Sequence, residues 1–149
     1  MFLVVLIVVL VVVCALGLLP NPLQCPKSQN DGFPTHVWGP GLWKLIHIMA
    51  ANYPLTYDPE RAKGYYAFFE SLKCTLPCKE CRAGYTAFIT NEGPLKLRPE
   101  LFADRETLFL WTTQLHDAVN AKLHKRGVKQ GQNWYPRYDA LRSGNVFFF

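Results

Sequence analysis

Three of the five cysteines lie within eight residues, in the segment Cys74-Thr75-Leu76-Pro77-Cys78-Lys79-Glu80-Cys81. Proline is tolerated at the edge of a helix but not inside it, and an amphipathic pattern follows Cys78. We therefore expect Cys78 at a helix N-terminus, with Cys81 one turn further on. Free backbone N–H groups and the helix dipole stabilise a thiolate at this position. The C-x-x-C pair is predicted to be a dithiol that closes to a disulfide and reopens.

The same spacing has other interpretations. It occurs as half of a zinc site, as a structural disulfide and, as C-x3-C-x2-C, in radical enzymes that hold an iron-sulfur cluster. A radical enzyme would need a larger α/β barrel around the cysteines. A zinc module would need a fourth ligand at close spacing, and a thioredoxin-like enzyme would need a βαβ core. The sequence contains no such pattern. We therefore favour redox chemistry and expect no metal site.

A second group of chemically capable residues follows helical spacing. In the helical pattern of residues 105–125, His116, Asn120 and His124 recur every fourth residue beside an apolar stripe. Buried polar groups of this kind are costly unless something polar fills the space next to them. The ladder therefore favours a bound polar ligand.

The remaining pattern is helical as well. Trp43 and His47 are four residues apart and project from one face of their helix, where alone they would fit a core aromatic and its hydrogen-bonded neighbour. We see no β alternation of useful length. The expected helices cover residues 41–53, 59–73, 78–90 and 105–125, with a short fifth at 134–141. This predicts an all-α fold, a four-helix bundle with a short fifth helix.

The N-terminal part differs in composition from the rest. Residues 1–19 are apolar and end at a proline, which predicts a transmembrane anchor or an uncleaved signal. Residues 20–37 are predicted to be a flexible linker, and residues 38–149 the folded domain. The nearest charge after the apolar run is Lys27, which favours a domain on the cytoplasmic side of a membrane.

The charge pattern limits the partners. The formal net charge is +5, but the basic residues are scattered along the chain, so we expect no nucleic-acid partner. The absence of an N-x-S/T sequon argues against a glycosylated, luminal protein.

Three motifs occur in a fixed order. They are Trp-x3-His-x2-Ala-Ala-x-Tyr-Pro from Trp43, Pro-Cys-x-x-Cys from Pro77, and Trp-x3-Leu-His-x2-Val-Asn from Trp111. Together they closely resemble the Erv/Alr family of FAD-linked sulfhydryl oxidases, over about residues 38–125. The resemblance implies a helical bundle that holds FAD between its helices, often as a homodimer. It also implies that disulfides are made in client protein dithiols, while electrons pass through the flavin to molecular oxygen and give hydrogen peroxide.

The resemblance also implies roles for single residues. Cys81 would be the flavin-proximal cysteine, and Cys78 would exchange with client thiols. The residues expected to bind the cofactor are Trp43, His47, Tyr53, His116, Asn120, Lys125 and Trp134. The first three would line the flavin site, the next two would meet adenine and ribose, the lysine would face a phosphate, and the last tryptophan would stack at the far end.

The chain departs from the family pattern in its other cysteines. A second, structural disulfide of many relatives is missing, since one of its positions is Thr113 and the other falls in residues 129–130. Cys25 and Cys74 are candidates for the shuttle cysteines of the family; an intersubunit bridge or plain thiols are the alternatives.

A short, membrane-anchored chain without that disulfide resembles the oxidases of large cytoplasmic DNA viruses. Such enzymes make disulfides on the cytosolic side of a host-cell or virion membrane, where thiol buffers would otherwise prevent them. The main alternative to an enzyme is a catalytically inactive, membrane-anchored structural or metal-binding protein.

Overall fold

The computed structural model describes residues 32–125, which contain four α-helices and one short 3-10 helix. They are α2 (Thr35–Ala51), α3 (Pro59–Thr75), α4 (Lys79–Thr90), η1 (Pro99–Phe102) and α5 (Arg105–Lys122). Within this range there is no strand, so the predicted all-α class is confirmed. None of the helices described here combines the length and hydropathy of a membrane span. The predicted anchor at 1–19 and the short fifth helix at 134–141 lie outside the described residues.

The helix starts follow from local sequence. The carboxylates of Asp58 and Asp104 accept hydrogen bonds from the backbone N–H three residues further on, at 3.0 and 2.8 Å. Cys78 is the N-cap of α4, and its Sγ accepts from the backbone N–H of Cys81 at 3.2 Å. Each cap satisfies an N–H group that the helix itself leaves without a partner. These three starts were predicted from the sequence and are confirmed.

Helix α2 begins earlier than the sequence indicated. Its first residue is Thr35, so the helix takes in the last three residues of the segment predicted to be a linker. Pro40 lies inside the helix, where a proline removes one backbone hydrogen bond. The indole N–H of Trp38 donates to the carbonyl of Phe33 at 2.9 Å and ties the start of α2 to the preceding residues.

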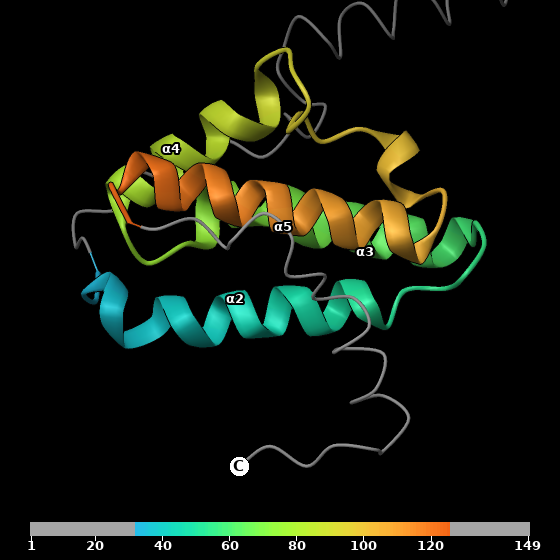
Figure 1. The fold of residues 1–149 in the computed structure, drawn as a ribbon, viewed down its shortest axis with the longest axis horizontal. Coiled ribbons are helices and arrows are strands. Elements are labelled where there is room, and N and C mark those ends of the chain that lie inside the picture. Colours follow the sequence, from blue (N-terminus) through green and yellow to red (C-terminus); the bar gives the residue numbers. More distant parts are fainter. Residues whose placement is uncertain (1–31, 126–149) are drawn as a thin grey trace, which may run out of the picture.

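The helices surround one aromatic core. Helices α2 and α5 run antiparallel and side by side, with α3 behind them and α4 at the end where α5 finishes (Figure 1). Trp111 of α5 is buried and packs edge-on against Phe69 of α3, with ring centroids 5.0 Å apart. Its indole N–H donates to the carbonyl of Leu95 at 3.1 Å. The indole ring of Trp111 is thus buried while its N–H group keeps a hydrogen-bond partner.

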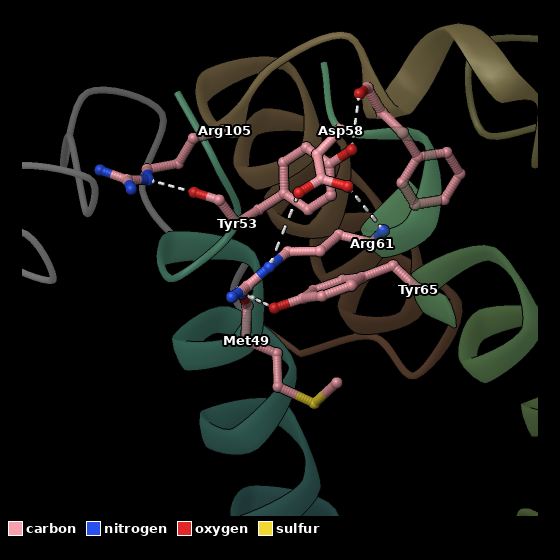
Figure 2. A network of polar contacts seen from close by, with 7 residues as sticks. Met49, Tyr53, Asp58, Arg61, Tyr65 and Arg105 are labelled. Carbon is pink, nitrogen blue, oxygen red and sulfur yellow. Dashed lines mark hydrogen bonds and ion pairs between the residues drawn. The ribbon is translucent and has the colours of Figure 1, made fainter. Parts of the chain in front are cut away.

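The end of α2 is fixed by a polar network (Figure 2). The Tyr53 hydroxyl donates to the carbonyl of Phe102 at 2.8 Å, and Arg105 Nε donates to the carbonyl of Tyr53. The Tyr65 hydroxyl donates to the carbonyl of Met49 at 3.0 Å. This network joins the C-terminal end of α2 to α3, η1 and α5. The candidate site lies at the opposite end of the bundle.

Helix α5 ends at Lys122, three residues before the predicted end at Lys125. His124 takes a left-handed conformation with φ 53°. Its N–H bonds to the carbonyl of Ala121 at 3.1 Å, and the N–H of Lys125 bonds to the carbonyl of Asn120 at 2.9 Å. This pair of bonds is the Schellman motif, which usually places glycine at the left-handed position. A histidine there costs roughly 1 kcal/mol, but the turn fixes the backbone of Lys125.

Candidate active site

Cys78 and Cys81 form a disulfide at the start of α4, with their Cα atoms 5.1 Å apart. Cys78 is the N-cap and Cys81 lies in the first turn, as the sequence predicted. Arg82 Nη1 donates to the carbonyl of Leu76 at 2.6 Å and so holds the chain that leads into the pair. Both sulfurs therefore lie where backbone N–H groups and the dipole of α4 stabilise negative charge.

The segment that enters α2 lies against the redox pair. Gly32 has a φ of +40°, and a Cβ atom on it would lie 1.3 Å from the carbonyl oxygen of Pro77. Only glycine allows such a close approach of two backbones. The residues before α2 therefore pass directly beside the peptide that precedes Cys78.

A cavity of about 610 Å³ opens between α2, α4 and α5. Its walls are largely apolar and include Trp38, Trp43 and Phe88. Lysines 44, 122 and 125 and the carboxylate of Glu80 also line it. Among the described residues, Cys81 belongs to the lining and Cys78 does not. The two cysteines of the disulfide therefore have different surroundings, because only Cys81 borders the cavity.

A chain of polar groups joins α2 to α5 at this cavity. His47 Nδ1 lies 3.2 Å from Thr112 Oγ1, and His47 Nε2 lies 3.0 Å from His116 Nδ1. The ring of His116 is stacked on Trp43, with centroids 4.1 Å apart and planes 6° from parallel. The Thr112 hydroxyl also donates to the carbonyl of Phe109 at 2.8 Å. Both imidazoles are thus held in position on more than one side.

Both histidines are neutral at physiological pH. Burial, and secondarily the charge of His116, lower the pKa of His47 to about 4. Burial is also the main cause that lowers the pKa of His116, with Asp117 opposing it and Lys125 adding to it. Neutral rings can each donate one hydrogen bond and accept another.

Most of the predicted cofactor-binding residues meet at this cavity. Those that line it are Trp43, His47, His116, Asn120 and Lys125. Of the two others, Tyr53 does not line it, and Trp134 lies outside the described residues. His124 of the predicted ladder is turned out of the helix and is not part of the lining described here.

Tyr53 requires a correction. It is completely buried at the other end of α2, and its hydroxyl is bound to the carbonyl of Phe102. The prediction that Tyr53 lines the flavin site therefore does not hold for this cavity. The resemblance alone had assigned Tyr53 to the site; the chain turns after α2 ends at Ala51 and directs this side chain into the core.

Only one of the two accessory cysteines, Cys74, lies among the described residues. Cys74, near the end of α3, is disulfide-bonded. Cys25 lies outside the described residues. The described residues contain no group of three or more His, Cys, Asp or Glu side chains arranged to hold a metal ion.

Sequence reasoning missed Thr112, Trp38 and Lys122. Thr112 is completely buried and precedes His116 by one turn, so extending the polar ladder one step towards the N-terminus would have found it. Trp38 was left outside the first expected helix, which was predicted to begin at residue 41, whereas α2 begins at Thr35. Lys122 looked like an ordinary solvent-facing residue, yet its Nζ would lie 2.5 Å from a Cβ atom on Gly84 of α4.

Comparison with known proteins agrees with this geometry. A sequence model of the Erv1/Alr family matches residues 40–139, a range that includes both the C-x-x-C pair and the His116 ladder. The chain belongs to the Erv1/Alr family. The match covers well over half of the chain.

Several relatives of this Erv1/Alr chain are viral. A protein of Acanthamoeba polyphaga mimivirus named probable FAD-linked sulfhydryl oxidase is 37% identical over 83 residues, 56% of this chain and 56% of the relative. The FAD-linked sulfhydryl oxidase of African swine fever virus (isolate Tick/Malawi/Lil 20-1/1983) is 32% identical over 95 residues, 60% of this chain and 70% of the relative. The chain thus spans only about half of the mimivirus protein.

The fold is also that of a solved family member. The crystal structure of the yeast Erv1 core superposes with a TM-score of 0.59 at 21% identity, covering 87% of this chain and 98% of that one. At this identity the likeness establishes the fold alone. The predicted family is confirmed by the sequence match and the predicted bundle by the structural one.

The depressed pKa of His47 predicts a pH dependence of stability. Between pH about 4 and 6.5 the unfolded chain binds a proton at this histidine that the folded chain does not, so the free energy of unfolding rises with pH across this range. The full effect is about 3 kcal/mol. Urea unfolding of the ligand-free chain at a series of pH values measures it. His47→Gln should flatten the curve, whereas His124→Gln, on the exposed turn, should not; an unchanged curve in His47→Gln would contradict the assignment.

Proposed function

We propose that this protein is an FAD-dependent thiol oxidase, which forms disulfides in client protein dithiols and passes the electrons to molecular oxygen to give hydrogen peroxide. Family membership supports the reaction class. The observation that carries the proposal is the asymmetry of the redox pair, because Cys81 lines a cofactor-sized cavity and Cys78 does not. One cysteine can thus serve the cofactor and the other the client.

The cavity fits FAD in size and in chemistry. Its volume of about 610 Å³ lies in the range of cofactor sites, and largely apolar walls with a few polar groups are typical of them. The stacked rings of Trp43 and His116 offer aromatic surface, and Asn120 offers an amide. Lys44, Lys122 and Lys125 bring positive charge suited to a diphosphate. When bound, FAD supplies a two-electron acceptor that can be reoxidised by oxygen.

The cysteines carry out the exchange. A client thiolate attacks Cys78 Sγ, the bond between Cys78 and Cys81 breaks, and Cys81 leaves as a thiolate. A second client thiolate then attacks the client sulfur of the mixed disulfide and releases Cys78. The client loses two electrons, which the pair gains as two sulfur anions or thiols. Because Cys81 lies in the first turn of α4, the helix N-terminus stabilises the leaving thiolate.

Cys25 and Cys74 are proposed to relay oxidising equivalents between clients and this pair. Gly32 lies against Pro77, so the segment that carries Cys25 joins the domain beside the redox site. Cys74 lies one short loop before Cys78 and is disulfide-bonded, which is the form that a relay needs. A Cys25→Ser variant should then lose more turnover with a reduced protein client than with dithiothreitol.

The proposed activity predicts a defined spectroscopic behaviour. The purified full chain should absorb in the flavin bands, bleach on anaerobic addition of dithiothreitol and recover in air. Cys81→Ser and Cys78→Ser should each keep the absorption but lose most of the bleaching, since either change removes the redox disulfide. Thr90→Val, on the exposed face of α4 and away from the cavity, is the matched control and should behave as the wild type.

Two outcomes would contradict this function. A colourless but folded chain would reject the cofactor. A flavin-containing chain without thiol-dependent oxygen consumption would favour the inactive structural protein instead.

We also propose a homodimer formed through α2. Val37, Leu45 and Ile48 are exposed at 62%, 49% and 43%, and with Gly41 they form one stripe on the face of α2 away from the core. A self-complementary apolar helix face suits a two-fold interface. Figure 1 shows α2 at the outside of the bundle, where a second copy can approach it.

The dimer is tested by placing charge in the stripe. Leu45→Glu and Ile48→Glu should each convert the dimer to a monomer, because a carboxylate would be buried against its own copy. Light scattering coupled to size-exclusion chromatography, with the mass of bound detergent subtracted, measures this. Leu55→Glu, at a leucine that is also exposed but lies outside the stripe, should leave the mass unchanged. A monomeric wild type would refute the interface.

We also propose that this is a single-pass protein of a host-cell or virion membrane, with its folded domain in the cytoplasm. The apolar residues 1–19 and the viral relatives support it. Expressed in cells, the chain should resist extraction at alkaline pH, and protease should digest its domain in intact microsomes. Protection of the domain until the membrane is dissolved would place it in the lumen.

A further inference from the structure

The hydrogen bonds between α2 and α5 have a direction. Thr112 Oγ1 lies 2.8 Å from the carbonyl of Phe109, and a carbonyl can only accept, so the single hydroxyl proton of Thr112 is used there. The contact of 3.2 Å between Thr112 Oγ1 and His47 Nδ1 can then be a hydrogen bond only if His47 Nδ1 carries a proton. Thr112 thereby selects one tautomer of His47.

The selection passes on to His116. A neutral His47 protonated at Nδ1 has a lone pair at Nε2, which lies 3.0 Å from His116 Nδ1. This contact is a hydrogen bond only if His116 Nδ1 is the donor. A neutral His116 protonated at Nδ1 has its lone pair at Nε2. Because its Nδ1 is taken by His47, Nε2 is the ring nitrogen that remains for a ligand in the cavity that His116 lines.

We propose that Thr112 is a positioning residue, which acts through His47 to make His116 Nε2 a hydrogen-bond acceptor towards the cofactor cavity. The cavity would then select a ligand with a hydroxyl or amino N–H donor at this place. That ligand rests on the proposed function, in which a nucleotide portion of FAD supplies such a donor. Stacking on Trp43 fixes the plane of the His116 ring and so the direction of the lone pair.

The same arrangement predicts how acid acts on the site. A proton added to His116 would occupy Nε2 and convert the acceptor to a donor, so the matched ligand group would lose its bond. The titratable groups around His116 are His47 on α2, Asp117 on α5 and Lys125 after α5. The affinity for FAD should therefore fall as His116 becomes protonated.

The tautomers can be measured directly. The full chain, labelled with 15N in its histidines, is compared with Thr112→Ser, Thr112→Val and Thr90→Val by long-range 1H–15N correlation at pH 7.5. Wild type, Thr112→Ser and Thr90→Val should show His116 protonated at Nδ1 only. Thr112→Val removes the acceptor for His47, so a mixture of His116 tautomers is expected.

Binding is measured on the same four proteins, by fluorescence titration with FAD after removal of any bound flavin. Thr112→Val should bind FAD at least fivefold more weakly, and Thr112→Ser within twofold of the wild type. At pH 5.5 the wild type should bind more weakly than at pH 7.5, and Thr112→Val should show a smaller difference, because its His116 is no longer a single tautomer.

Three results would overturn the proposal. They are a wild-type His116 protonated at Nε2, a single unchanged His116 tautomer in Thr112→Val, and an FAD affinity of Thr112→Val equal to that of the wild type. A failure of the proposed function would give a different experimental result. A chain that binds no FAD rejects the oxidase and the ligand assignment, while the tautomer spectra alone then decide whether Thr112 positions His116.

Discussion

A polar contact across the core holds the site together. His47 is buried on α2, where an imidazole without partners would cost a substantial part of the stability of a small domain. Thr112 and His116 of α5 supply both partners. Because three side chains on two helices must meet at hydrogen-bond distance, the register of α2 against α5 is fixed. The cavity beside them, with Trp43 stacked on His116, then has a fixed shape.

The redox pair depends on a different constraint, the start of a helix. Cys78 caps α4 and Cys81 lies one turn inside it, so a single disulfide spans the end of the helix dipole. Its two sulfurs have different neighbours, since only Cys81 belongs to the lining of the cavity. The position of α4 at the end of the α2 and α5 pair thus gives the two cysteines of one disulfide different surroundings.

The two ends of the bundle have separate tasks. At one end, Tyr53, Tyr65 and Arg105 bind backbone carbonyls and close the fold around an aromatic core. At the other, the polar groups of His116, Asn120 and Lys125 line the cavity.

The sequence alone determined the features that depend on neighbouring residues. The caps at Asp58, Cys78 and Asp104 and the helices that follow them were predicted because capping is local, and the motifs led to the family. Tertiary structure decided the rest. Tyr53 follows His47 by only six residues, yet the turn after α2 buries it in the core. Thr112 looked like an ordinary helical threonine until packing brought it to His47, because hydrogen bonds between distant helices depend on their register rather than on local sequence.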